Sequence, residues 1–207
     1  DYDKDATYPA ASASELGSAL NEGKIVALSK DITTNDTIVV NNKTATLDAN
    51  GKTVDNTDEI WNEDTGNWSL VSARNQANLT ITGNGNFKAK ENDCFAVDVQ
   101  DGSTVTIKNG TFVGNVHAVY VLEGTAIIEG GTYSVQQKYS DASKADEFVL
   151  NCYDANRANG TAKIIVKGGT FINFNPADCQ AEGAHTNFVA NGYKVTSKTV
   201  GKDTYYT

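Results

Sequence analysis

Short apolar segments alternate with polar, glycine-rich turns along most of the chain. One phrase recurs, apolar-x-apolar-polar-(Gly/Asn)-Gly-Thr-aromatic, over residues 105–112, 126–133 and 164–171, with a degenerate copy over 79–87. The aromatic residues that end these copies are separated by 25, 21 and 38 residues. Two of these intervals are near the length of a solenoid turn and the third carries an insertion, so the pattern predicts a repeat protein.

A second phrase runs in phase with the first. Residues 95–99 and 117–121 each precede a glycine turn that leads into the next copy, and 148–152 is a third example. No amphipathic helical period lies between these segments, which indicates short β-strands separated by turns.

Strands this short do not bury an apolar face alone. If like residues stack on like at the strand spacing of about 4.8 Å, Val97 lies under Val119 and Phe112 under Tyr133 as continuous internal ladders. We therefore predict an all-β fold, a single-stranded parallel β-helix.

Residues 12–23 are the one segment with a clear helical pattern. Ser12 and Glu15 have the spacing of a capping box, while Leu16 and Leu20 lie on one apolar side. We expect this short helix to cap the exposed first turn of the solenoid.

The 207 residues suit a single domain. We expect an N-terminal arm and capping helix over 1–23, solenoid turns over 24–172, and a C-terminal loop with edge-capping strands over 173–207. The segments expected to form strands of the first and last turns are 24–28, 37–40, 45–47, 188–190 and 193–195, with 204–207 also covering the C-terminal edge.

The phrases at 47–53, 79–83 and 168–171, together with a tail over 175–206, resemble right-handed parallel β-helix (pectate-lyase-like) proteins of gut Bacteroidales surfaces and of their phages. The resemblance implies a right-handed winding and, from the phage proteins, a trimer or contacts with virion neighbours. It resides in residues that form the fold, so it implies architecture more than activity.

The charge and composition of the chain exclude some classes of binding partner. A formal net charge of −9 argues against nucleic acid or an anionic membrane surface, which need a concentrated positive face. No apolar run is long enough to span a bilayer, so membrane insertion is not expected. The sequence lacks methionine and starts at Asp1, from which we expect an exported, cell-surface or virion-matured product.

The sequence contains no complete pattern of a metal-binding or cofactor-binding site. The acidic residues 1–5 resemble the start of a calcium loop, but glycine and the final glutamate are missing from it. Cys94, Cys152 and Cys179 lack metal or redox spacing, so we expect buried thiols rather than a disulfide. No cofactor is predicted.

Three polar segments, 55–66, 136–147 and 153–159, are expected to project from the solenoid as loops. Insertions in such folds tend to lie on one face and often bind partners. Candidate ligand-binding residues are the aromatics Trp61, Tyr120, Tyr139 and Tyr153, because sugar rings stack on exposed aromatic faces.

Strict alternation along 95–99 places Phe95 inside and Asp98 outside, and it places His117 on the inward side. Tyr120 then aligns with Asp98, and either Asn151 or Tyr153 lies at the following level.

With Asp154 and Arg157, Asp98 forms the candidate set for a polysaccharide lyase or hydrolase. A second carboxylate on the same wall is missing. Our first hypothesis is therefore a non-catalytic surface or virion module that contacts glycans or proteins through side loops. The alternatives are a small β-helix lyase or hydrolase, and a purely structural decoration of a capsid or tail.

Overall fold

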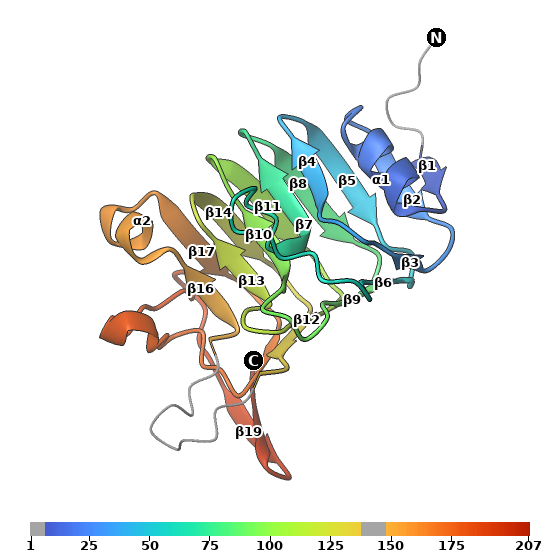
Figure 1. The fold of residues 1–207 in the computed structure, drawn as a ribbon. Coiled ribbons are helices and arrows are strands. Elements are labelled where there is room, and N and C mark those ends of the chain that lie inside the picture. The colour runs from blue at the N-terminus through green and yellow to red at the C-terminus, as the bar shows by residue number, and fades with distance from the viewer. Residues whose placement is uncertain (1–6, 138–147) are drawn as a thin grey trace.

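The computed structural model describes residues 7–137 and 148–207 (Figure 1). The described residues form three sheets and are largely β. The seven-stranded sheet contains β1 (Thr7–Ala10), β2 (Ile25–Leu28), β5 (Thr44–Asp48), β8 (Asn78–Thr82), β11 (Ser103–Ile107), β14 (Gly124–Ile128) and β17 (Ala162–Val166). The five-stranded sheet contains β4 (Ile38–Asn41), β7 (Ser69–Arg74), β10 (Phe95–Val99), β13 (Val119–Val121) and β16 (Leu150–Cys152).

The eight-stranded sheet contains β3 (Ile32–Thr33), β6 (Thr53–Asp55), β9 (Asn86–Lys88), β12 (Thr111–Gly114), β15 (Thr132–Val135), β18 (Thr170–Ile172), β20 (Asp203–Tyr206) and β19 (Ser197–Val200). From β2 to β18, successive strands join the seven-, eight- and five-stranded sheets in rotation. Each strand from β2 to β15 pairs in parallel with the strand three places later. We call three successive strands, such as β8, β9 and β10, a level. In Figure 1 the colour runs from blue to orange along these levels.

The core lies along the stack as ladders of like side chains. Val97 pairs with Val119 in parallel register, which confirms the predicted stacking. Phe87, Phe112, Tyr133 and Phe171 form a buried column in which consecutive ring centroids are 4.9, 5.2 and 5.1 Å apart. Aromatic contacts of this kind add to the free energy gained by burying the rings.

The N-terminal helix is α1 (Ala13–Leu20). The Ser12 hydroxyl accepts a hydrogen bond from the Glu15 amide, and the Glu15 carboxylate accepts one from the Ala11 amide. Leu16 and Leu20 are fully buried, and the helix contacts β1, β2, β4 and β5. The predicted helix, its cap and its position over the first strands are confirmed.

Of the predicted C-terminal segments, 204–207 is confirmed as an edge-covering strand, since β20 (Asp203–Tyr206) pairs with β18, whereas 188–190 and 193–195 are wrong. Residues 193–195 form no strand, and 188–190 contributes only an isolated bridge between Val189 and Val166. β20 forms an antiparallel hairpin with β19, which was not predicted, and Tyr206 lies opposite Phe171 of β18. Thr, Val and Tyr favour strands, and Gly201, at φ +62°, provides the turn.

Two short helical segments were not predicted. Residues 153–159, expected as a loop, contain α2 (Asp154–Asn159), which ends at Gly160 with φ +85°. A 3-10 turn, η2 (Ala181–Gly183), lies in the C-terminal segment. All three cysteines are buried thiols, as the sequence predicted.

Candidate functional site

The five-stranded sheet carries several of the predicted site residues. Ser72, Asp98, Tyr120 and Asn151 lie in register across β7, β10, β13 and β16. The predicted alignment of Asp98 with Tyr120 is confirmed. Asn151 occupies the following level, whereas Tyr153 lies beyond the end of β16.

Strict alternation fails at the start of β10. Ala96 and Val97 are consecutive, yet both belong to the buried core cluster, so Phe95 lies on the opposite side of the sheet. The ring contacts agree, because the rings of Phe95 and His117 pack on Tyr120, with centroid distances of 5.1 and 5.5 Å. The prediction that Phe95 and His117 face inward is wrong.

A cluster of five rings covers this outer face. Trp61 stacks on Trp68 at 6.1 Å and meets Phe95 edge-on at 5.5 Å. Trp68 meets Tyr120 edge-on at 6.1 Å, and Phe95 lies 5.0 Å from His117. Both tryptophans and Tyr120 remain partly exposed. We call these five residues the aromatic platform.

In segment 55–66, residues 57–59 and 62–65 are exposed, but the C-terminal end of the segment is held to the sheet by Arg74. The Arg74 guanidinium donates hydrogen bonds to the Gly66 carbonyl oxygen and to Asn67 Oδ1, both at 2.8 Å. Its Nε–H donates to Ser72 Oγ at 2.9 Å. Arg74 therefore holds this segment against the outer face of the sheet.

Asp98 lies beneath the held segment and is 0% exposed, so the prediction that it faces solvent is wrong. The Ser72 hydroxyl donates a hydrogen bond to its carboxylate, and Gln100 Nε2 lies 3.4 Å from both carboxylate oxygens. Burial raises the pKa of Asp98 to about 6, against the opposing effects of Ser72, Arg74 and other donors. An enclosed carboxyl does not reach a polymeric substrate.

His117 is also buried. Its Nδ1 lies 2.5 Å from the Phe148 carbonyl oxygen, which assigns the proton to Nδ1. Burial lowers the pKa of His117 to about 4, although this hydrogen bond opposes the shift. The imidazole is neutral at pH 7, as expected of a buried structural histidine.

The other candidates lie at the next level. Tyr153 precedes α2 and is 46% exposed. Asp154 and Arg157 form an ion pair within α2, so each charge has its partner there. Tyr139 falls in 138–147, outside the described residues.

Comparisons with known proteins leave the chain without an assigned family. It matches no family model, no curated protein and no solved structure. The similarity to pectate-lyase-like proteins therefore remains a prediction from residues 47–53, 79–83 and 168–171.

Two further features bear on the chemistry. Among residues 7–137 and 148–207, no group of three or more His, Cys, Asp or Glu side chains is arranged to hold a metal ion. Within the same residues, no helix has the length and apolar character needed to cross a membrane.

Sequence reasoning missed the residues that build the covered face, namely Ser72, Arg74 and Gln100. Ser69-Leu-Val-Ser72 occupies the place in the repeat that Phe95-Ala-Val-Asp98 occupies one level later. Recognition of residues 69–72 as an earlier copy of the phrase at 95–98 would have placed Ser72 opposite Asp98. No local signal links Arg74 to Gly66 and Asn67.

Proposed function

We propose that the chain is a right-handed parallel β-helix that serves as a non-catalytic display module outside the cell or on a virion. The rotation of successive strands among three sheets supports a wound ribbon, as does the parallel register of Val97 with Val119 and of Phe112 with Tyr133. A stiff stack of levels is suited to presenting a side surface to a partner.

The aromatic platform is the observation that carries the functional proposal. Trp61 and Trp68 are stacked, partly exposed and supported from below by Phe95 and Tyr120. A supported ring is held in place before binding, so little conformational entropy is lost when a ligand stacks on it. Tyr153 extends the apolar surface at the next level.

The surroundings of Trp61 favour a glycan as the ligand. Asn62, Glu63 and Asp64 follow it and are exposed. Amide and carboxylate groups accept and donate the hydrogen bonds that sugar hydroxyls require, while the indole face takes the apolar side of the ring. The alternative ligand is a protein partner that packs an apolar side chain against the aromatic platform.

The lyase or hydrolase alternative has less support. Its central carboxylate, Asp98, is fully buried, and Asp154 is paired with Arg157. An acid–base pair needs two carboxyl groups that reach the scissile bond from solvent.

Glycan-array binding by the wild-type protein and by Trp61→Ala tests the proposal. We expect binding that is lost in Trp61→Ala and partly kept in Trp61→Phe, which retains a ring face. Tyr8→Ala, an aromatic truncation on β1 at the edge of the seven-stranded sheet, is the matched control and should bind as wild type. Turnover of a polysaccharide by the purified chain, or unchanged binding in Trp61→Ala, would contradict the proposal.

A further inference from the structure

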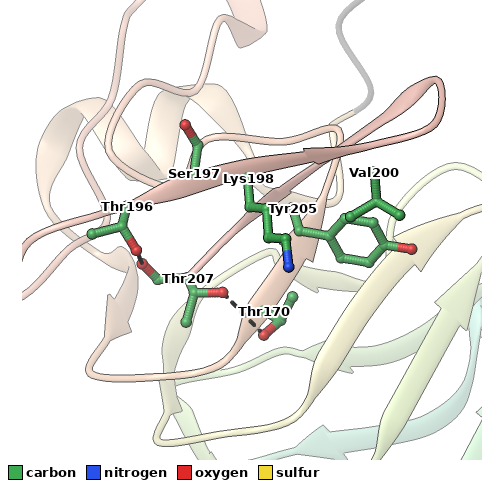
Figure 2. A pocket seen from close by; sticks show the side chains of 7 residues that line it. All are labelled: Thr170, Thr196, Ser197, Lys198, Val200, Tyr205 and Thr207. Atoms are coloured by element: carbon green, nitrogen blue, oxygen red, sulfur yellow. Dashed lines mark hydrogen bonds between the residues drawn. The ribbon is translucent and has the colours of Figure 1, made fainter.

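The three sheets differ in how their last parallel strands, β16, β17 and β18, are covered. In the eight-stranded sheet, β20 pairs with β18, and Figure 2 shows Thr207, the residue after β20, beside Thr170 of β18, with 3.2 Å between the two hydroxyl oxygens. In the five-stranded sheet, the Cys179 thiol donates a hydrogen bond to the Leu150 carbonyl oxygen of β16, at 3.7 Å. Both of these strands therefore have a later part of the chain against them.

Most of β17, the last strand of the seven-stranded sheet, is uncovered. The Val166 amide donates a hydrogen bond to the Phe188 carbonyl oxygen at 2.8 Å, and the Val166 carbonyl oxygen accepts one from the Ala190 amide at 2.9 Å. Backbone groups alternate in direction along a strand, so those of Ala162 and Ile164 point to the same side as those of Val166. No described residue forms a backbone hydrogen bond with Ala162 or Ile164 on that side.

A groove of about 480 Å³ lies along this open edge. Residues 162–165 of β17 and residues 186–191 of the C-terminal segment line it. The side chains of Ala162 and Ile164 are buried in the core, so it is their unpaired backbone N–H and C=O groups that face the groove. An open strand edge of this kind is a template for the addition of one more extended strand.

The opposite edge of the same sheet is β1, which is not suited to strand addition. The Ser29 amide donates a hydrogen bond to the Ala10 carbonyl oxygen at 2.8 Å, so the backbone of Ala10 faces β2. By the same alternation, the backbone of Pro9 lies on the free side of β1, and proline has no N–H to donate. A second copy therefore does not extend the sheet by pairing its β1 with β17, and a segment outside the sheets is needed.

Charge at the open edge favours an acidic segment. Residues 148–207 contain six Lys or Arg and four Asp or Glu, a net charge of +2, whereas the whole chain has −9. Lys163 of β17 lines the groove, is exposed and forms no ion pair with another described residue.

Residues 1–6, which precede β1, have the complementary charge. Their sequence, Asp-Tyr-Asp-Lys-Asp-Ala, contains three carboxylates and one lysine. Side chains alternate along an extended strand, so the three carboxylates would lie on one side, with Tyr2 and Lys4 on the other. A carboxylate opposite Lys163 on the neighbouring strand forms a favourable cross-strand pair.

The segment has to come from another copy of the chain. β1 and β17 are the first and last of seven strands, so six spacings of about 4.8 Å place them roughly 29 Å apart. Six fully extended residues span at most roughly 21 Å. Residues 1–6 therefore do not reach β17 of their own copy.

We propose that residues 1–6 of a second copy add to β17 as an extended strand, with their carboxylates beside Lys163, so that copies of the chain associate head to tail. The contact lies on other strands than the aromatic platform, so it goes beyond the proposed function. Each added copy brings one free segment and one free edge, so the association continues to higher mass and does not close as a trimer.

Sedimentation velocity of the full chain, from about 10 μM to about 1 mM, tests the inference. We expect an average mass that rises with protein concentration and falls as salt is added. Lys163→Glu should weaken the association about threefold to thirtyfold, and so should a variant in which Asp1, Asp3 and Asp5 are all changed to Asn. Lys43→Glu, at an exposed lysine between β4 and β5, is the matched control and should associate as wild type.

A mixture of the two defective variants tests the direction of the contact. The Lys163→Glu chain keeps the acidic segment, and the triple Asn variant keeps the groove. At a concentration where each variant alone is monomeric, an equimolar mixture should form one-to-one dimers and no larger species.

Hydrogen exchange followed by NMR tests the pairing of the added strand. On association the amide of Ile164 should exchange about tenfold or more slowly, because its N–H gains a partner. The Val166 amide, which is already bonded to the Phe188 carbonyl oxygen, is the internal control and should change little.

Four outcomes would overturn the inference. One is a wild-type chain that stays monomeric at about 1 mM. Another is association that neither Lys163→Glu nor the triple Asn variant weakens, including a trimer of fixed mass, because the copies would then meet on another surface. The third is unchanged exchange at Ile164 in the associated protein. The fourth is association that is lost only in Trp61→Ala, which would place the contact between copies on the aromatic platform.

Discussion

The Ser72 hydroxyl donates a hydrogen bond to the Asp98 carboxylate between two neighbouring strands, and both side chains are fully buried. They lie on the side of the five-stranded sheet opposite the core residues Val97 and Val99. Arg74 donates hydrogen bonds to Ser72 Oγ and to Gly66 and Asn67, so it joins the end of the segment before β7 to this pair. The enclosed carboxyl has an altered pKa, and this makes the stability of the protein depend on pH.

Asp98→Asn tests the effect of this carboxyl on stability. Its pKa is raised from 3.8 to about 6 in the folded chain, mainly by burial, so between these values the folded state binds more protons than the unfolded state. Its contribution to stability is therefore fully present below pH 4 and is lost as pH rises to 6. Relative to wild type, Asp98→Asn should gain roughly 3 kcal/mol of unfolding free energy between pH 4 and pH 7. Urea unfolding at each pH gives the unfolding free energy of both proteins. If the difference between them stays constant from pH 4 to pH 7, the raised pKa of Asp98 is wrong.

His117→Gln should show the opposite dependence on pH. Burial lowers the pKa of His117 from 6.5 to about 4, so the unfolded state binds more protons in this window, and stability rises with pH up to about 6.5. The variant lacks this term and should lose roughly 3 kcal/mol relative to wild type as pH rises from 4 to 7. Urea unfolding of wild type and His117→Gln from pH 4 to pH 7 measures this difference in unfolding free energy. His185→Gln, at an exposed histidine paired with Asp178, is the control for changing a histidine elsewhere.

Arg74→Met should release the covering segment while keeping much of the aliphatic stem. The guanidinium bonds to the Gly66 carbonyl oxygen and to Asn67 Oδ1 would be lost, at a cost of about 1 to 3 kcal/mol. We expect faster proteolysis between residues 60 and 68 and faster hydrogen exchange at that segment. Arg157→Met removes an arginine that pairs on α2 and should leave this segment protected. Equal protection in both variants would show that Arg74 does not hold the segment.

The core ladders were predictable from the sequence because similar apolar or aromatic residues recur at one-level intervals. Val97 over Val119 and Phe112 over Tyr133 follow from the repeat and from the need of short strands to bury apolar side chains. The capping helix was predictable because Ser12 and Glu15 form a local signal.

The outer face was not predictable in the same way. Its burial depends on Arg74 reaching Gly66 and Asn67, which no local pattern encodes. Phe95 faces away from the core because Ala96 and Val97 both lie in it. Strict alternation along a strand does not allow two consecutive residues on the same side, so it predicted the wrong side for Phe95. The recurring Gly-Thr phrase was visible in the sequence, but the alignment of its threonines on one side of the eight-stranded sheet required the strand pairing.

Gly131→Ala should destabilise the fold at the turn that repeats through the stack. Gly131 has φ +101°, and an added Cβ would lie 3.0 Å from the Gly110 carbonyl oxygen of the preceding level, which is a rigid neighbour. A backbone conformation of this kind costs a residue other than glycine about 1 to 3 kcal/mol, so the unfolding midpoint in urea should fall. Gly17→Ala is the matched control, because Gly17 lies within α1 and a Cβ there meets nothing within 4 Å. That variant should gain about 0.5 to 1 kcal/mol, since alanine favours a helix interior. A Gly131→Ala protein as stable as wild type would mean that the turns between levels tolerate side chains, and that the glycines of the repeat are not fixed by the backbone.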